Sequence, residues 1–415
     1  MIIMGGTFPS VDQEYQEEFI KYAFKAMNDY GDLFHKEDFD FVKFKEFFEL
    51  PCNLQSKERE KRIQEKILKL KGECTLEEEQ LRNETSEVRC IALAIETRPD
   101  YCKEEHINNM LRLGCTRVEL GVQTIYNEIL EKVERGHSVE DSIEATRLMK
   151  DSFLKVGYHL MPGLDGSDRK KDLELFEKIF SDENFKPDFL KIYPCMVMPG
   201  TKLYKKFEAN KFTPITTEEA AEVIVEGKKF VPKYCRIQRI QRDIPTTVTA
   251  AGVDVTNLRQ HVEKKLKEKN IQCKCIRCNE PKNKDVGEVK LKRIDYDASG
   301  GKEIFLSFED DKGTLIGFCR MRKCSAPFRP EITKDSMGIR EIHVYSPSLK
   351  IGKTDSGSVQ HRGYGMKLMQ EAEKIAKEEF GAKKMLVIAG IGVREYFIKK
   401  LKYKKDGIYV SKSLS

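Results

Sequence analysis

Short apolar runs alternate with longer amphipathic stretches over the first 245 residues of the chain. The runs are nearly continuous, as is typical of strands that are buried on both faces of a parallel sheet. They cover residues 2–4, 90–95, 118–122, 156–161 and 189–193. Between two of them, one helical face carries the apolar residues Leu173, Phe176, Ile179 and Phe180. Repeated strand–helix units of this kind predict a parallel α/β barrel, complete or partial, with its chemistry at the carboxyl ends of the strands.

The period of the pattern changes after residue 286. Apolar and polar residues alternate at positions 304–308 and again at 316–318, on either side of a Glu-Asp-Asp-Lys-Gly turn. This alternation indicates a hairpin of an antiparallel, half-solvated sheet. The elements expected after it are a strand at 340–345, a helix at 365–380, a strand at 384–389 and a helix at 394–400. We therefore expect a second, α+β domain, which divides the chain into a barrel at 1–245, a linker at 246–290 and this domain at 291–415.

Composition narrows the class of protein only slightly. A length of 415 residues suits two or three domains. No apolar run approaches the roughly 18 residues that cross a bilayer, and the start of the chain lacks the features of a secretory signal. The net charge of +6 does not by itself indicate nucleic acid. Most of the 12 cysteines are scattered singly through expected core segments, which favours a reducing, cytoplasmic environment.

Three cysteines form the one cluster in the sequence. Cys273, Cys275 and Cys278 have the spacing of thiolate ligands on a turn, which suits tetrahedral zinc better than core packing or free thiols. The fourth ligand has to come from elsewhere, and Cys235 and His261 are both candidates. A catalytic role for this metal is not expected, because nothing nearby looks like an acid or base poised over an open coordination position.

A basic stretch precedes the linker. Residues 236–242 mix polar and apolar positions, which predicts a strand with one cationic face formed by Arg236, Arg239 and Arg242. Such a face either is solvated or contacts the phosphates of a nucleic acid, and charge alone does not separate the two. The isolated histidines His35, His106 and His159 lack metal-like partners at helical spacing, so we expect packing or surface roles for them.

A glycine-rich turn in the α+β domain is the strongest single signal. Gln360, Arg362, Gly363, Tyr364 and Gly365 lie between an expected strand and an amphipathic helix. Glycines at the entrance of a helix expose backbone N–H groups to a pyrophosphate, and the helix dipole attracts the anion. A Gly-x-Gly pair alone also fits a simple tight turn. In this order of elements it predicts a site for a CoA thioester such as acetyl-CoA.

The order of strand, basic turn, helix, strand and tyrosine-bearing helix resembles the GNAT family of N-acetyltransferases over roughly the last 115 residues. This resemblance implies that backbone groups of Arg340, Glu341, Ile342 and His343 pair with the pantetheine arm. It also implies that Tyr396 lies near the thioester, where a phenol can hydrogen-bond a developing thiolate. The alternative for Tyr396 is an ordinary packing role.

The motifs of the barrel form a set although each is weak alone. They lie at residues 5–7, 90–101, 119–123, 135–137, 159–164, 193–194 and 241–245. Together with the second domain, they resemble the catalytic-subunit family of Elongator, the radical-SAM tRNA uridine acetyltransferases, from Met1 to Ser415. This resemblance implies a radical-SAM barrel joined through a zinc-binding linker to an acetyltransferase domain.

The resemblance also implies the reaction of that family. A 4Fe–4S cluster cleaves S-adenosylmethionine, the radical abstracts hydrogen from the acetyl methyl group, and the carbon adds to C5 of the wobble uridine at position 34. Hydrolysis of the thioester then leaves a carboxymethyl group. Gly5 and Gly6 would meet the methionine end of the cofactor, and Glu96, Arg98 and Gln123 would line its pocket, with Glu96 and Gln123 in catalytic roles beside Tyr396.

The same resemblance implies partners. The basic strand would face the anticodon region of tRNA, and a homodimer or accessory subunits are further expectations. No membrane association is expected.

Two features depart from the family pattern. The cysteine triplet expected upstream of the Gly-Gly strand is not present, so we expect a truncated chain that binds acetyl-CoA and tRNA but does not generate the radical. The family run Tyr-Tyr-x-Lys-Leu-Gly-Tyr has an extra residue here and lacks its glycine. It reads Tyr-Phe-Ile-Lys-Lys-Leu-Lys-Tyr from Tyr396 to Tyr403, so the helix end is expected to shift.

Two other functions fit parts of the sequence. A protein lysine acetyltransferase would need a general base on the central strand, for which Glu341 is the obvious candidate. A non-catalytic RNA-binding module would explain the basic stretch alone.

Overall fold

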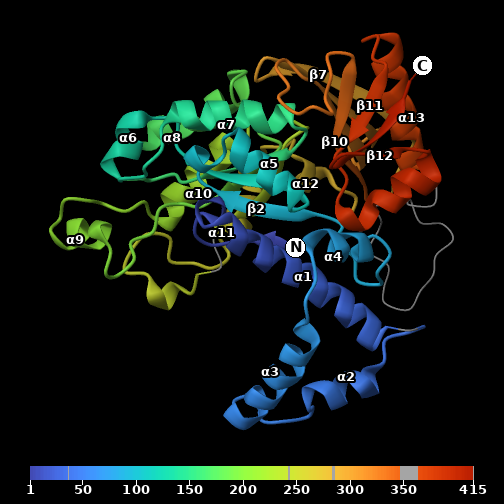
Figure 1. Ribbon diagram of the computed structural model, residues 1–415. Coiled ribbons are helices and arrows are strands. Elements are labelled where there is room, and N and C mark those ends of the chain that lie inside the picture. Colours follow the sequence, from blue (N-terminus) through green and yellow to red (C-terminus); the bar gives the residue numbers. More distant parts are fainter. Residues whose placement is uncertain (36, 242–243, 283–285, 346–362, 415) are drawn as a thin grey trace.

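The computed structural model describes residues 1–35, 37–241, 244–282, 286–345 and 363–414 (Figure 1). Arg242, Gln360 and Arg362, which we expected at the RNA and CoA sites, lie outside the described residues. Two sheets organise the chain, one of six strands and one of seven. The expected fold class, a partial parallel barrel followed by an α+β acetyltransferase-type domain, is confirmed.

The first sheet is parallel throughout, and its strands follow the order of the sequence. The strands are β1 (Ile2–Ile3), β2 (Leu93–Thr97), β3 (Cys115–Gln123), β4 (Lys155–Leu160), β5 (Phe189–Ile192) and β6 (Arg236–Ile240). The helices between β2 and β6 are α5 (Glu104–Arg112), α6 (Asn127–Lys132), α7 (Val139–Asp151), α8 (Arg169–Ser181), α9 (Lys202–Glu208) and α10 (Thr217–Gly227). An unclosed parallel sheet of this kind is a partial barrel.

The two faces of this sheet differ in chemistry. Successive side chains in a strand point to opposite faces. Apolar residues such as Leu120 and Ile192 take one face, and both are fully buried. The cross-strand register places Glu119 beside Glu96, and the same face also carries His159 and Lys191. The prediction of burial on both faces is confirmed, but the inner face is charged, a distinction that the near-continuous apolar pattern did not indicate.

A bulge sets the cationic face of β6. Arg236 pairs with Phe189 and Arg239 pairs with Lys191, with one extra residue between the two pairs. Without that extra residue, positions three apart would point to opposite faces. Both arginines therefore lie on the inner face of the barrel.

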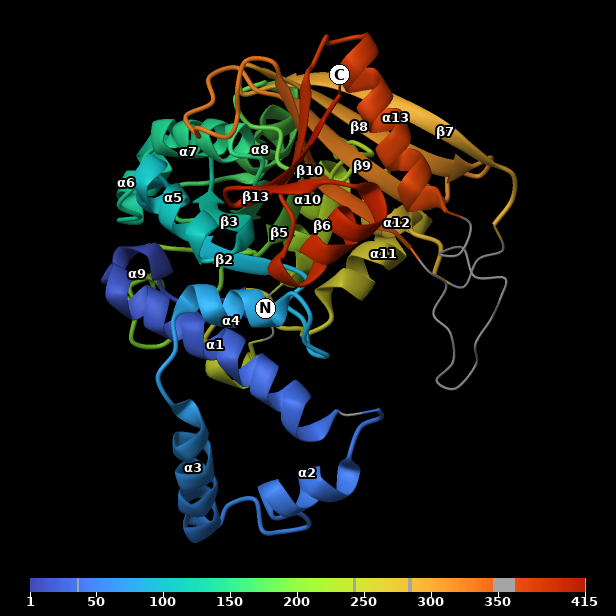
Figure 2. The same ribbon diagram turned by 45° about the vertical axis from the view of Figure 1, so that its right-hand side comes forward.

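Four helices lie between β1 and β2, and the sequence pattern did not predict them. They are α1 (Gln13–Phe34), α2 (Phe41–Phe48), α3 (Lys57–Lys71) and α4 (Leu76–Asn83). Figure 2 shows α2 and α3 projecting away from the rest of the molecule. In contrast, α1 and α4 pack on each other, where Asn28 donates a hydrogen bond to Glu79 at 2.7 Å.

The segment after β6 packs onto the barrel. It contains α11 (Leu258–Glu268) and the short α12 (Ile276–Asn279). Val262, Leu266 and Cys275 belong to the same hydrophobic core as the barrel strands. The division of the chain at residues 245 and 290 stays a prediction.

The second sheet is antiparallel apart from one central pair. Its strands are β7 (Val289–Ala298), β8 (Gly301–Asp310), β9 (Leu315–Lys323), β10 (Ser336–Val344), β11 (Lys384–Val387), β12 (Lys404–Asp406) and β13 (Tyr409–Ser413). The parallel pair is β10 with β11. Helix α13 (Tyr364–Glu378) covers one face through Leu368 and Met369 (Figure 1). The other face contacts the barrel.

Buried ion pairs join the two sheets. Asp188, at the start of β5, accepts hydrogen bonds from Arg340 of β10 at 2.6–2.9 Å. Arg322 of β9 pairs with Asp151 at the end of α7 at 2.7 Å. All four side chains are essentially inaccessible to solvent. Because Arg forms such bidentate pairs in one geometry, these contacts fix how the second sheet sits on the barrel.

The tyrosine run near the C-terminus folds as a π-helix, Tyr396–Lys400, instead of the α-helix expected at 394–400. A π-helix accommodates one extra residue per turn, which matches the insertion in this run. Lys402 then takes a left-handed backbone with φ of 63°, at the place where the family pattern has glycine. Tyr403 is buried and donates a hydrogen bond to Glu373 at 2.9 Å, so the second tyrosine has a structural role.

Candidate functional site between the two sheets

A notch opens between β10 and β11. The parallel pairing of these strands ends at Ile339 and Val387, whereas β10 continues to Val344 along β9. A bulge between Ile339 and Glu341 accompanies this separation. Beyond the notch, one edge of β10 has no neighbouring strand, so its backbone groups are available to an extended, amide-containing ligand. This is the segment of residues 340–343 that we expected to bind pantetheine.

The notch leads into a cavity of about 400 Å³ that both domains line. We call it the interdomain cavity. Residues of β10, including Glu341, Ile342 and His343, form one wall together with Tyr396. The barrel contributes the start of its strands, with Arg117 and Lys155 among its lining residues. A ligand that enters at the notch therefore reaches the inner face of the barrel.

The negative charge of Glu341 is balanced by two cations inside this cavity. It forms ion pairs with Lys155 of β4 and with Arg320 of β9, the latter at 2.8 Å. Burial alone would raise the pKa of Glu341, but the charges of Lys155 and Arg320 lower it to about 2. A carboxylate held in this way is a poor proton acceptor near neutral pH. The base that a lysine acetyltransferase would need is thus not supplied by Glu341.

Tyr396 and the start of α13 lie on the outer side of the cavity. The Tyr396 side chain is 42 % exposed, and its Oη comes within 3.8 Å of the position that a Cβ would take at Gly365. Gly363, which precedes the helix, has φ of 71° and open space around its Cα. The side chain of Tyr364 instead packs on Ile316 in a small apolar cluster, so its side chain does not face a ligand.

A charged cluster occupies the inner face of the barrel near the carboxyl ends of its strands. His159 lies 2.8 Å from Glu119, and Lys191 bridges Glu119 and Glu96, reaching Glu96 at 2.9 Å. Burial would raise the pKa of Glu119, but the His159 hydrogen bond and the charges of Arg117 and Lys191 lower it to about 2. The expectation that His159 is an isolated packing residue is wrong. A single charged or histidine residue inside each of three predicted apolar runs was the signal that could have revealed this cluster.

Gln123 and the Gly5–Gly6 pair lie at the carboxyl edge of the sheet. Gln123 is buried with φ of 67°, and no described residue donates a hydrogen bond to its Oε1. Gly5 and Gly6 have φ of 89° and 60° with open space beside them. Arg98 is paired with Asp100 at 2.9 Å. This edge fits a small ligand that carries N–H or O–H donors.

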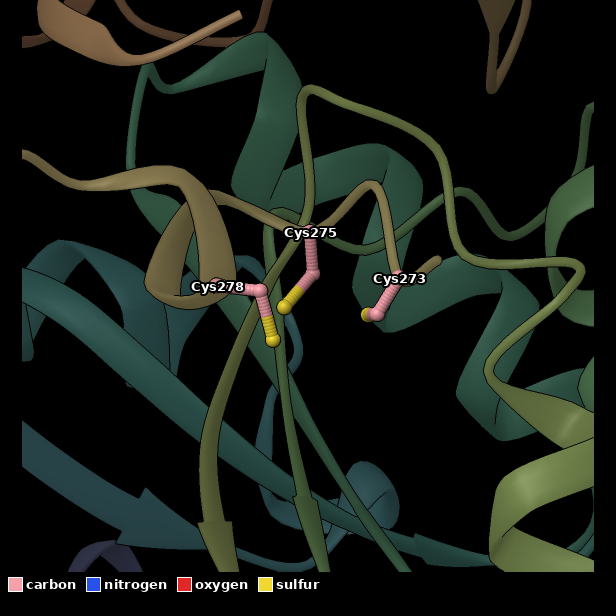
Figure 3. Close-up of side chains that lie close together, drawn as sticks. All are labelled: Cys273, Cys275 and Cys278. Carbon is pink, nitrogen blue, oxygen red and sulfur yellow. The ribbon is translucent and has the colours of Figure 1, made fainter. Parts of the chain in front are cut away.

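The three clustered cysteines lie at the opposite edge of the barrel (Figure 3). Their Sγ atoms all lie within 4.8 Å of one another. The adjoining helix α12 begins at Ile276, whose N–H donates to the carbonyl of Cys235 just before β6 starts. Three thiolates at this separation fit one tetrahedral zinc ion.

Neither residue expected to complete the metal site does so. Within the described chain, Cys235 and His261 place no ligand atom in the group of three thiolates. The nearest charged neighbour is the buried Lys228, whose Nζ lies 3.8 Å from Cys278 Sγ. A cation at this distance offsets the negative charge that three thiolates bring to a zinc site.

The arginines of β6 face the protein and not an open surface. Arg236 donates to Glu280 at 2.8 Å and to Tyr345 Oη at 2.9 Å, which leaves its side chain 22 % exposed. Arg239 hydrogen-bonds Tyr193, the next residue after β5. The guanidinium of Arg236 is thus paired between the domains in this structure, and its expected contact with RNA phosphate stays a prediction.

Together, the two sheets and the cavity define a radical-SAM-type half-barrel joined to an acetyltransferase-type domain. The Radical SAM superfamily model matches residues 56–176, and the Radical SAM C-terminal domain model matches residues 187–268. A solved structure, the archaeal Methanocaldococcus infernus Elp3 with N-terminus deletion (1-46), aligns with a TM-score of 0.85 at 48% identity, covering 99% of this chain and 89% of that one.

Relatives with curated names extend the match over the whole chain. The tRNA uridine(34) acetyltransferase of Methanocaldococcus jannaschii is 48% identical over 425 residues, which span 100% of this chain and 71% of the relative. Elongator complex protein 3 of Homo sapiens is 35% identical over 421 residues, which span 100% of this chain and 69% of the relative. The chain belongs to the tRNA uridine(34) acetyltransferase family, which includes Elongator complex protein 3. Among the described residues, no helix is both long and apolar enough to span a bilayer.

Proposed function

We propose that the protein holds acetyl-CoA in the interdomain cavity and transfers the acetyl carbon skeleton to C5 of the wobble uridine of tRNA. The observation that carries this proposal is the joint lining of one cavity by β10 of the acetyltransferase-type domain and by Arg117 and Lys155 of the barrel. A thioester bound in the notch would extend its acetyl group toward the inner face of the barrel. That geometry suits chemistry at the methyl carbon better than transfer to a surface lysine.

Three features support acetyl-CoA as the ligand. The unpaired edge of β10 offers backbone groups to the pantetheine amides. The first turn of α13 offers N–H groups to the pyrophosphate. Tyr396 offers a phenol to the sulfur. Each contact uses backbone or uncharged donors, which suits a long anionic ligand that must also leave.

The carboxyl edge of the barrel supports S-adenosylmethionine as a second ligand. Gln123 Oε1 is buried without a described donor, and open space lies beside Gly5 and Gly6, which follow β1. When bound and reduced, S-adenosylmethionine would supply the hydrogen abstraction from the acetyl methyl group. No three-cysteine group lies at this edge among the residues described, so we derive no step through a 4Fe–4S cluster.

We further propose that Cys273, Cys275 and Cys278 hold a structural zinc ion. Replacing Cys275 with serine should abolish stoichiometric zinc, measured by plasma mass spectrometry after dialysis, and should lower Tm because metal binding adds to folding free energy. The control is Cys52→Ser, since Cys52 is a lone, half-buried residue. Retention of zinc by Cys275→Ser would contradict the assignment.

The proposed function is tested by CoA release. The protein is incubated with acetyl-CoA, with and without tRNA, and free thiol is measured. We expect tRNA to accelerate release, because the acyl group should be hydrolysed only when the uridine side of the cavity is filled. A tRNA with cytidine at position 34 serves as the control for the anticodon. Equal rates with and without tRNA would reject the proposal.

Two other outcomes would identify the alternatives. Acetylation of a lysine peptide at the rate of CoA release, detected by mass spectrometry, would indicate a protein acetyltransferase. Binding of tRNA with a steep salt dependence but no acetyl-CoA turnover would indicate an RNA-binding module. Detection of carboxymethylated uridine after supply of S-adenosylmethionine and reductant would support the full reaction.

A further inference from the structure

His343 occupies a distinct position in the interdomain cavity. It lies on β10 opposite Phe318 of β9, on the same face of the strand as Glu341. Its ring stacks on Phe318 with a centroid separation of 6.0 Å and meets Tyr345 edge-on at 4.4 Å. The aromatic contacts hold the plane of the imidazole while the residue stays exposed within the cavity wall.

Several elements place charged groups around His343. Glu341 lies on its own strand, Lys155 on β4, Arg236 on β6 and Glu280 just after α12. Partial loss of solvent around the ring is the main cause that lowers the pKa of His343, and Lys155 and Arg236 lower it further against the opposing effect of the two glutamates. This environment therefore favours the neutral form of the imidazole. Within the described part of the chain, no hydrogen bond to its ring nitrogens is found.

The other ionisable groups of the cavity are unsuited to accept a proton. Glu341 is paired with Lys155 and Arg320, and Arg340 is paired with Asp188. Arginine and lysine are cationic donors, and the phenol of Tyr396 donates as well. Among the described residues that line the cavity, His343 is thus the one side chain with an imidazole nitrogen and no described hydrogen-bond partner.

We propose that His343 is the catalytic base that activates water for hydrolysis of the acyl thioester, an inference that rests on the proposed function. An imidazole nitrogen accepts a proton from water as the water oxygen forms a bond to the thioester carbonyl carbon. The carbon–sulfur bond breaks, and the thiolate takes the proton from the imidazolium. Thioester and water thereby give carboxylic acid and thiol without an oxidant or another reactant. Tyr396 hydrogen-bonds the departing sulfur.

The test compares His343→Gln with His343→Phe. Glutamine keeps a polar side chain and phenylalanine keeps the aromatic stack on Phe318, but neither accepts a proton near neutral pH. Both variants should lose tRNA-stimulated CoA release by about 100-fold or more, the typical contribution of a general base. The Kd for acetyl-CoA in the absence of tRNA, measured by calorimetry, should stay within about threefold of the wild-type value, because only the chemical step is removed.

The pH profile separates a base from a merely structural residue. The wild-type rate of CoA release should rise with pH through an apparent pKa below the usual histidine value of about 6.5 and then level off. This limb should disappear in His343→Gln. Imidazole added to His343→Ala should restore part of the rate, which a packing role does not predict.

The outcomes distinguish this inference from the proposed function. If tRNA stimulates the wild-type protein and His343→Gln equals it in rate and pH profile, His343 is not the base although the proposed function stands. If the variants weaken acetyl-CoA binding and rate in parallel, His343 contributes binding alone, and the inference is likewise overturned. If tRNA does not stimulate the wild-type protein, the proposed function fails and this inference fails with it.

Discussion

Two neighbouring regions between the sheets contain the same kinds of residue but arrange them differently. The buried carboxylate of Asp188 is paired on several sides: Arg340 donates at 2.6 Å, Arg320 lies at 3.6 Å, and the Val156 N–H donates at 2.7 Å. In the interdomain cavity beside it, His343 has no described hydrogen-bond partner and Tyr396 is 42 % exposed. A buried charge that is fully paired fixes geometry, whereas a polar group left without a partner is available for a ligand. The first region is therefore structural and the second is the site.

The largest expected effect comes from breaking the matched region. Asp188→Asn leaves Arg340 and Arg320 buried beside a neutral partner, which should lower the free energy of unfolding by about 3–5 kcal/mol. Urea denaturation followed by circular dichroism measures it. Asp311→Asn, at an exposed turn position, is the control and should change little. A shift for Asp188→Asn no larger than the control would show that the ion pairs do not hold the sheets together.

Acid should act on the same region. The pKa values of Asp188 and Glu341 in the folded protein are both lowered to about 2, because the neighbouring cations outweigh the effect of burial. A lowered folded-state pKa contributes stability above the unfolded-state pKa, which is about 4 for these groups. This stability is lost as the pH falls from about 4 toward 2. Thermal unfolding measured across this range should show a steep fall in Tm that is shallower in Asp188→Asn.

A change in the cavity should affect chemistry and leave stability intact. Tyr396→Phe removes a phenol that we place near the thioester sulfur, so tRNA-stimulated CoA release should fall by about 100-fold. The Tm should stay close to that of the wild type because the side chain is partly exposed. Tyr15→Phe, which alters an exposed phenol on α1, is the matched control. Loss of stability without loss of rate would assign Tyr396 to the structural region.

The smallest effect is expected from a change at Tyr403, which follows Tyr396 by seven residues. Its hydroxyl donates to Glu373 at 2.9 Å from a buried position. Tyr403→Phe should therefore lower the free energy of unfolding by about 1 kcal/mol, the usual contribution of one hydrogen bond. CoA release should be unchanged. A marked loss of rate would show that both tyrosines of the run serve the reaction.

The sequence patterns located most helices and strands, but they did not predict which partners the charged side chains have. Strands β2 to β5 fall on the predicted apolar runs, and α13 falls within about two residues of its expected bounds. The helices between β1 and β2 were not predicted, since nothing in the strand–helix pattern required an insertion there. His159 was misassigned, and the pairing of Arg236 was not predicted, because their partners Glu119 and Tyr345 lie far from them in the sequence.

The sequence alone determined the local structure of this protein. The alternation of apolar and polar residues set the strands and helices, and the glycine at 363 set the left-handed turn into α13. Only the tertiary structure decided which charges are neutralised, because pairing depends on distance in space. Arg340 and Asp188 are separated by 152 positions. The same folding joined Glu341 to Lys155 and left His343 facing the cavity, so the chemistry of the site became readable only once the two sheets were in contact.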